Sequence, residues 1–520
     1  MSVMAETGKK MKYYILLGIV ILTAAGLRLY RLDYHSMWDD EARTYLAGTT
    51  DTLGGALSFT IAVDYGTPPG NLLPRYLLTK IFGKSTYVFT LPSVIFSLLG
   101  IFLYFLLFSR LAGNKTALLA CILIAIHPEE ISYAMTPRNY AVLNTVIPLS
   151  FLLLILAVKK QKYLWYFFHG ISLALCYYAH LLTAGIALSQ GVIIIFLLLS
   201  GRGNLSINRL RLFTGFSLSI AVSAVFFLPW LLELFKIKLH NSLNLIVSGP
   251  SWHSPLDIVY IFVFGRGPFK IITLLLVLPG ILKLYKDKPF LPVALVEVLA
   301  VSAFVSWLLM HANFFHVRYV IFLLPVFLLL PAAGIAEISE KLRQIFPRYK
   351  LSAAVSLLLV LFLFASSSGK LADWYRKGRA YDGNWKEAAH RMQSLYQPGD
   401  AIIIPYFHAM IFSVYSSLPV YFINNSAPSF ISISDFSKYN RRPWKNINLN
   451  LYNGKQYAAE FGGKNVWLLC IRNLSSAENT DTEGASLSRF TEKTGVHPCG
   501  EKILGHSYIY FYRLGNGIIH

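Results

Sequence analysis

Long runs of apolar residues alternate with short polar segments along most of the chain. Examples are "YYILLGIVILTAAGL", "TYVFTLPSVIFSLLGIFLYFLLF" and "LSAAVSLLLVLFLFA". A run of about 17–25 apolar residues is long enough to cross a bilayer as a helix. Run length and loop charge together predict about eleven membrane helices, near residues 13–29, 85–108, 115–133, 140–158, 163–179, 181–200, 212–232, 268–285, 290–310, 317–336 and 350–368. The predicted fold class is a polytopic α-helical membrane protein.

The pattern changes after residue 369. An amphipathic helical segment is followed by a Pro-Gly turn, a short buried strand at 401–404 and a helical pattern at 405–416. "KNVWLLCIRN" and "SYIYFYRL" have the pattern of further strands. We therefore expect two domains, a transmembrane domain over residues 1–369 and a small α/β domain over residues 370–520.

Composition and charge agree with this division. Of the 520 residues, 55% are hydrophobic and 14% are charged, whereas a soluble protein has roughly a quarter of its residues charged. The net charge of +21 comes largely from basic loops between apolar runs, which favours membrane topology over nucleic-acid binding. The positive-inside rule predicts a multi-pass protein of the cell membrane with a cytoplasmic N-terminus and an extracytoplasmic C-terminal domain.

The tightest group of acids follows the first apolar run. Asp39, Asp40 and Glu41 lie in "SMWDDEARTYLAG", on the predicted outer side. Ser36 or Asp39 could cap a helix that begins near Asp40, and acids are favoured in a first helical turn. Capping does not explain three acids beside a bilayer, where ionisable groups are costly and usually functional. The same outer loop contains an expected interfacial helix around Leu72.

Other candidate side chains lie on the same predicted side. Arg138 in "MTPRNY" and Arg318 in "FFHVRYV" could either snorkel to headgroups or grip a phosphate. His180, at a turn between two apolar runs, and His316 could be structural or could bind substrate. No histidine spacing typical of a metal site is present, and no cofactor is indicated. Cys470 and Cys499 could pair if the C-terminal domain is extracytoplasmic.

Several motifs in order resemble one known group of enzymes. They are "WDDEA" at 38–42, "TPPG" at 67–70, "FGKSTYVFTLPS" at 82–93, "HPEEISYAMTPRNYAVL" at 127–143, Tyr178 to His180, "RY" at 318–319 with Pro325, and "NWKEAA" at 384–389. The chain resembles the lipid-phosphate-sugar-dependent glycosyltransferases of the GT-C fold. This group contains the protein O-mannosyltransferases and the aminoarabinose transferases of lipid A.

The resemblance implies the reaction and the roles of several residues. A monosaccharide, a hexose or a pentose, would pass with inversion from a polyprenyl-phosphate donor to a lipid, glycan or protein acceptor outside the cytoplasm. Asp40 would be the catalytic base, with Glu41 beside it, and Arg138 and Arg318 would bind the donor phosphate. Asp64, Tyr140, His180 and His316 are candidate substrate-binding residues. Two arginines on a monophosphate leaving group reduce the need for a divalent metal.

The chain departs from the family pattern at Thr67, at Thr136 and Pro137, and at Gly70, where relatives carry leucine after the double proline. These departures concern the donor sugar and some binding contacts. Two other classes remain open on the sequence. A polytopic transporter or lipid flippase also needs charged groups within a membrane, and a receptor or scaffold could bind through the C-terminal domain. An internal repeat, common in transporters, is not evident here.

Overall fold

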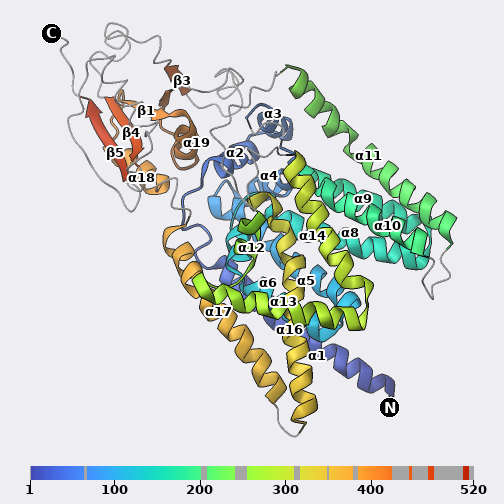
Figure 1. Cartoon of the computed structure of the whole chain (residues 1–520). Coiled ribbons are helices and arrows are strands. Elements are labelled where there is room, and N and C mark those ends of the chain that lie inside the picture. The colour runs from blue at the N-terminus through green and yellow to red at the C-terminus, as the bar shows by residue number, and fades with distance from the viewer. Residues whose placement is uncertain are drawn as a thin grey trace.

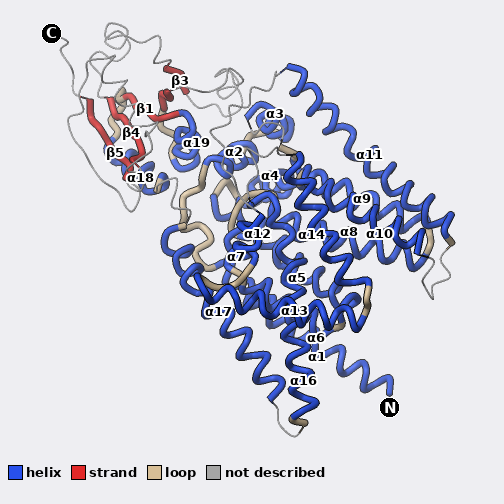
Figure 2. The backbone as a smooth tube through the Cα atoms, in the orientation of Figure 1, coloured by secondary structure: helices blue, strands red, loops and turns tan. Residues whose placement is uncertain are grey.

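The chain folds into a large helical body and a small domain that contains all the described strands (Figure 1, Figure 2). The computed structural model describes residues 2–63, 67–200, 208–240, 255–309, 317–347, 351–378, 384–423, 444–447, 466–472 and 508–514. The expected domain boundary at residues 369 and 370 falls inside one helix, α17 (Leu351–Lys377), which runs from the helical body toward the small domain.

Fifteen α-helices and four 3₁₀ helices make up the described part of the helical body before α17. The α-helices are α1 (Ser2–Leu29), α2 (Asp39–Gly48), α3 (Leu53–Val63), α4 (Leu72–Phe82), α5 (Thr86–Ala112), α6 (Asn114–Ile126), α7 (Pro128–Ala134), α8 (Tyr140–Lys160), α9 (Tyr163–Ala179), α10 (Ala184–Ser200), α11 (Arg209–His240), α12 (Pro255–Phe262), α13 (Lys270–Asp287), α14 (Phe290–Leu309) and α16 (Leu324–Ile345). The 3₁₀ helices are η1 (Pro69–Asn71), η2 (Leu181–Thr183), η3 (Gly267–Phe269) and η4 (Val317–Leu323).

The predicted polytopic fold is confirmed. Within the described residues, nine helices are long and apolar enough to cross a membrane, or ten if the bent pair of α6 and α7 forms one span. The predicted continuous helix over 115–133 is wrong, because the chain bends by 64° between α6 and α7. The cause is Pro128, which has no amide hydrogen and disfavours helical geometry at His127, whose backbone is extended.

Helix α16 lies at the centre of the body. In the candidate span Arg318–Ile345, which contains α16, 94% of an apolar 18-residue stretch is buried. In the candidate span of α1, 17% of such a stretch is buried. Gly280 of α13 and Gly334 of α16 allow these two helices to touch. A Cβ atom on Gly334 would lie 1.9 Å from the Leu276 carbonyl oxygen, so only glycine fits there. This contact fixes the position of α16, which directly follows η4, the 3₁₀ helix that contains Arg318.

The small domain has the predicted α/β composition. It contains α18 (Trp385–Leu395), α19 (Tyr406–Tyr415) and the strands β1 (Ala401–Pro405), β2 (Val420–Ile423), β3 (Trp444–Ile447), β4 (Val466–Arg472) and β5 (Tyr508–Leu514). The strand order is β3-β2-β1-β4-β5. β1 pairs in parallel with β2 and β4, and β5 closes one edge as an antiparallel strand. The expected strand at 401–404 and the helix at 405–416 are both confirmed. Cys499, half of the expected disulfide, lies outside the described residues.

Candidate active site

Helix α2 begins with the three consecutive acids, and their side chains contact different partners. The sequence predicted a cap from Ser36 or Asp39, and this is wrong. The backbone N–H of Trp38 donates instead to Oε2 of Glu41 at 3.3 Å, so Glu41 closes the first turn. Glu41 is 7% exposed. Its position supports the helix that carries Asp40.

Asp40 and Arg318 meet across the site, although 278 positions of sequence separate them. Nη1 of Arg318 lies 3.4 Å from Oδ2 of Asp40, and the two side chains are 24% and 22% exposed. The Arg318 guanidinium also lies over the Trp38 ring, 4.8 Å from its centroid, and donates to the Tyr319 hydroxyl at 3.2 Å. Both side chains of the ion pair are therefore partly exposed.

Arg138 reaches the same point from another direction. Its Nη1 donates to the Asp40 carbonyl oxygen at 3.1 Å and to Oγ1 of Thr44 at 2.8 Å. Two guanidinium groups from distant segments thus converge on one residue of α2. The sequence placed Asp40, Arg138 and Arg318 on one side of the membrane, and the structure brings the three together.

A third arginine, Arg75 of α4, holds the segment before Arg138 in place. It is fully buried and donates to the Phe89 carbonyl at 2.6 Å, to Oγ of Ser93 at 2.7 Å and to the Arg138 carbonyl at 3.4 Å. Burial lowers the pKa of Arg75 to about 9, and the charge of Glu41 opposes this. Arg75 was not among the residues that the sequence indicated. It shares the buried face of α4 with Leu72 and Thr79, and a charge on that face was the available signal.

Asp39 pairs with Arg43, one turn along α2. Arg43 also donates to the Val63 carbonyl at 3.4 Å, which ties α2 to the end of α3. Burial raises the pKa of Asp39 to about 6; the charge of Arg43 opposes this shift and that of Asp40 adds to it. Through Arg43, Asp39 therefore contributes to the packing of α2, although its side chain is 23% exposed, similar to the 22% of Asp40.

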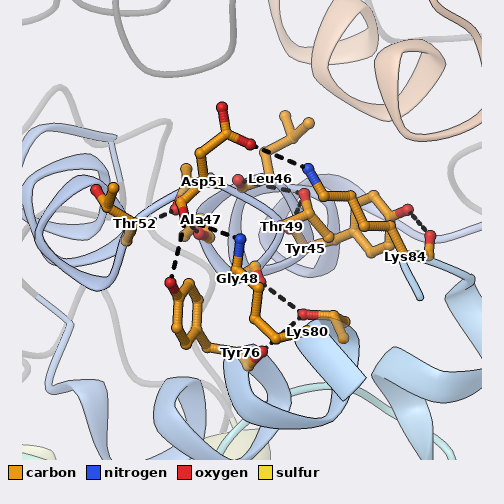
Figure 3. Close-up of polar contacts among 12 residues, drawn as sticks. Tyr45, Leu46, Ala47, Gly48, Thr49, Asp51, Thr52, Tyr76, Lys80 and Lys84 are labelled. Carbon is orange, nitrogen blue, oxygen red and sulfur yellow. Dashed lines mark hydrogen bonds and ion pairs between the residues drawn. The ribbon is translucent and has the colours of Figure 1, made fainter. Parts of the chain in front are cut away.

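The end of α2 opposite the acids is anchored to α4 and to the loop after it (Figure 3). The Tyr76 hydroxyl and Nζ of Lys80 both donate to the Asp51 carbonyl, at 3.3 and 2.8 Å. Nζ of Lys84 lies 3.5 Å from Oδ1 of Asp51. Because both ends of the helix are held, Asp40 is presented on a fixed support.

His180 lies at the turn between α9 and α10, on the same side as the two arginines. Its Nδ1 accepts a hydrogen bond from the Leu182 N–H at 3.2 Å, and its ring centroid is 6.1 Å from that of Tyr319. Burial and then the charges of Arg138 and Arg318 lower its pKa to about 4. His180 is thus neutral near pH 7.

Gly70 explains one departure from the family pattern. A Cβ atom at this position would lie 2.4 Å from the Tyr178 carbonyl oxygen and 2.9 Å from the Ala179 nitrogen. The loop of η1 therefore touches the backbone of the turn that carries His180. A leucine, which the resemblance implied here, does not fit this approach.

Three further candidates from the sequence are Tyr140, Asp64 and His316. Tyr140 begins α8, interacts electrostatically with Arg318, and packs edge-on against Tyr133 with 4.6 Å between ring centroids. It therefore lies beside the converging arginines. Asp64 and His316 lie outside the described residues. Within the described part of the chain, no group of three or more His, Cys, Asp or Glu side chains is arranged to hold a metal ion.

The small domain contacts the site through α19, which packs against α2 (Figure 1). The Met37 N–H, two residues before α2, donates to the Tyr415 hydroxyl at 2.7 Å. Met37, Ala42, Trp385 and Phe412 share one buried cluster. No sequence pattern indicated this contact, because it joins residues far apart in the chain.

Comparisons with known proteins support the resemblance that the motifs indicated. Residues 67–232 match the family described as dolichyl-phosphate-mannose-protein mannosyltransferase. This stretch includes Arg138 and His180 but neither Asp40 nor Arg318. No protein of curated function matches the chain by sequence.

The whole chain is similar in structure to solved glycosyltransferases. It matches ArnT from Cupriavidus metallidurans bound to undecaprenyl phosphate with a TM-score of 0.60 and 11% identity, over 99% of both chains. The apo state of ArnT gives a TM-score of 0.58 and 12% identity, over 98% of both chains. The oligosaccharyltransferase of Archaeoglobus fulgidus gives 0.56 and 14%, over 89% of this chain and 69% of the other. The chain therefore has the GT-C fold, and the resemblance is confirmed at this level.

Proposed function

We propose that this protein is a membrane glycosyltransferase that moves one sugar from a polyprenyl-phosphate donor to an acceptor hydroxyl. The family match and the GT-C fold support the class of enzyme and the class of donor. The observation that carries the proposal is the convergence of Arg138 and Arg318 on Asp40. A carboxylate that contacts one guanidinium, with a second guanidinium on its own backbone carbonyl, is suited to a reaction in which a base takes up a proton while a phosphate leaves.

In the proposed reaction, the acceptor oxygen forms a bond to the anomeric carbon of the donor sugar. The bond between that carbon and the phosphate oxygen breaks, and its electron pair leaves with the polyprenyl phosphate. Asp40 takes the proton of the acceptor hydroxyl. The charge that develops on the phosphate is stabilised by the guanidinium groups of Arg138 and Arg318. Attack on the face opposite the leaving group inverts the configuration.

The other residues of the site have supporting parts in this proposal. Glu41 fixes the first turn of α2 through the Trp38 N–H. Arg318 contacts the carboxylate of Asp40 and, in this proposal, also contacts the donor phosphate. His180 and Tyr140 lie close enough to these cations to contact the sugar or the phosphate.

The site is proposed to face the outside of the cell membrane. The basic loops predict a cytoplasmic N-terminus, and alternation of the eleven helices predicted from the sequence then puts α2, α4 and the small domain outside. The exposed apolar side chains Leu73, Leu77 and Ile81 of α4 are suited to lie in the membrane interface. Labelling a single cysteine introduced in α18 of intact cells with an impermeant reagent tests this orientation. Labelling only after permeabilisation contradicts it.

Turnover in detergent with labelled polyprenyl-phosphate sugars tests the activity itself. Label should leave the donor in the wild type and remain on it in Asp40→Asn. The donor sugar is identified by which labelled donor loses its label, and the acceptor class by the product that receives it. Movement of intact donor across proteoliposomes without cleavage of the sugar–phosphate bond would instead indicate a flippase.

A further inference from the structure

An apolar cavity of about 540 Å³ lies in the helical body at the end opposite α2. It is enclosed by α5, α8, α10, α14 and α16. Apart from its mouth, the side chains that line it are aliphatic or aromatic, with Tyr104 carrying the one hydroxyl group among the described lining residues. Pockets of this size, roughly 300–1,000 Å³, commonly hold a small-molecule ligand.

Three cations stand at the mouth of the cavity, each from a different segment. Arg110 is in the last turn of α5, Lys159 is in the last turn of α8, and Lys288 lies between α13 and α14. Nζ of Lys288 donates to the Arg110 carbonyl at 2.8 Å, which holds these two residues side by side. The described residues that line the cavity include no acid. Asp287, which precedes Lys288, pairs instead with Lys283 at 2.9 Å.

The walls of the cavity come from two groups of helices. Phe196 of α10 stacks on Phe290 of α14 with 5.6 Å between ring centroids and nearly parallel planes. Phe290 also lines the cavity, on the side formed by α10 and α14, while α5 and α8 form the other side. An acyl chain in the cavity would contact both groups, and its headgroup would lie among the three cations.

We propose that this cavity is a binding site for a phospholipid with an anionic headgroup. Basic pockets between membrane helices at the basic-loop side are suited to such lipids, and each cation near the headgroup adds to the attraction. The site is separate from the convergence of Arg138 and Arg318 on Asp40, and the proposal does not depend on the glycosyltransferase activity. Bound lipid would stabilise the packing of α10 and α14 against α5 and α8.

The alternative is that the three cations only mark membrane topology and that any lipid fills the cavity. Native mass spectrometry of the full chain in detergent, with phosphatidylglycerol or phosphatidylcholine of the same acyl chains, separates the two. The wild type should retain phosphatidylglycerol at least tenfold better. A triple variant, Arg110→Gln with Lys159→Gln and Lys288→Gln, should lose this preference. Lys160→Gln is the matched control, since Lys160 is exposed beside Lys159 but does not line the cavity.

A second pair of variants tests whether the lipid enters the cavity. Ala294 lines it, so Ala294→Leu and Ala294→Trp should progressively reduce retention and remove the rise in Tm on adding phosphatidylglycerol. Ala300→Trp on the exposed face of α14 should leave both unchanged. Equal retention of the two lipids by the wild type overturns the proposal. Phosphatidylglycerol retention that neither Ala294 variant reduces would also overturn the proposal. A preference of the wild type for polyprenyl phosphate over phosphatidylglycerol would do the same.

Discussion

The guanidinium of Arg318 lies 3.4 Å from the carboxylate of Asp40, and Arg138 holds the backbone carbonyl of the same aspartate at 3.1 Å. Arg318 lies in η4, just before the central helix α16, and Asp40 lies in the first turn of α2. This arrangement places one carboxylate and two guanidinium groups close together. The first two predictions follow from it.

Asp40→Asn should abolish transfer while the protein stays folded and retains donor. Asparagine has nearly the same shape and can still accept a hydrogen bond from Arg318, but it cannot take the acceptor proton in this role. Loss of a general base typically reduces the rate by about 10²–10⁴. The measurement is turnover at saturating donor, with thermal unfolding and donor retention as controls for folding and binding.

The neighbouring acids provide matched controls for Asp40. Asp39→Asn should be milder, because Asp39 pairs with Arg43 on the packed side of α2. The activity of Glu41→Gln should lie between those of Asp39→Asn and Asp40→Asn, since glutamine can still accept a hydrogen bond from the Trp38 N–H. An inactive Asp39→Asn beside an active Asp40→Asn would mean that the base is the preceding acid. Activity in all three variants would mean that the base lies elsewhere, with Asp64 the next candidate.

Arg138→Ala and Arg318→Ala should each weaken donor binding. A phosphate in a partly dry site loses a charge-assisted hydrogen bond, which costs about 1.5–3 kcal/mol, or roughly 10–150-fold in affinity. Arg318→Lys should recover part of the loss, because lysine keeps the charge but not the two-pronged geometry. Binding is measured by titration with unlabelled polyprenyl phosphate.

Arg266→Ala is the control for the arginine variants. Arg266 is 53% exposed and pairs with Asp373, away from Asp40. Its loss should leave donor affinity unchanged. If Arg138→Ala and Arg318→Ala behave like this control, the two arginines only contact headgroups or support the fold.

Gly70→Ala should lower both stability and activity. The added Cβ would meet the Tyr178 carbonyl at 2.4 Å, so the turn that carries His180 must move. Overpacking of this kind costs about 1–3 kcal/mol. Gly54→Ala in α3 is the matched control, because a Cβ there meets nothing within 4 Å. Thermal unfolding and turnover check both variants, and equal behaviour of the two would contradict the close approach at Gly70.

His180 should make the protein less stable as the pH falls. Its pKa is lowered from 6.5 to about 4, so the folded state binds this proton less readily than the unfolded state. The stability that depends on neutral His180 is therefore fully present above pH 6.5 and is lost as the pH falls from about 6.5 to 4. His180→Gln removes this contribution, and its Tm should fall less than that of the wild type between pH 7 and 4.5.

The comparison of pH profiles needs a second histidine variant. His390 is exposed on α18, and His390→Gln should follow the wild-type profile. The other titrating groups are common to all three proteins, so their contributions cancel in the differences. A profile for His180→Gln that is parallel to the wild type would show that His180 is not buried in neutral form.

The sequence by itself determined the membrane fold, because hydrocarbon leaves a spanning segment almost no choice but an apolar helix, and long apolar runs are visible without any partner. It also indicated Asp40, Arg138 and Arg318, since charged groups near a bilayer are rare and costly. The bend at His127 could have been expected from Pro128, but run length alone suggested one helix.

Only the tertiary structure decided which partner each charged side chain contacts. Three adjacent acids look alike in sequence, and their different partners depend on which helices pack beside α2. Arg75 was missed because its partners are carbonyl and hydroxyl groups of distant segments, which have no local pattern. The contact of Tyr415 with Met37 and the fit of Gly70 against Tyr178 likewise depend on long-range packing. Hydrophobic periodicity shows which side of a single segment is buried, whereas a site forms where several distant segments pack together.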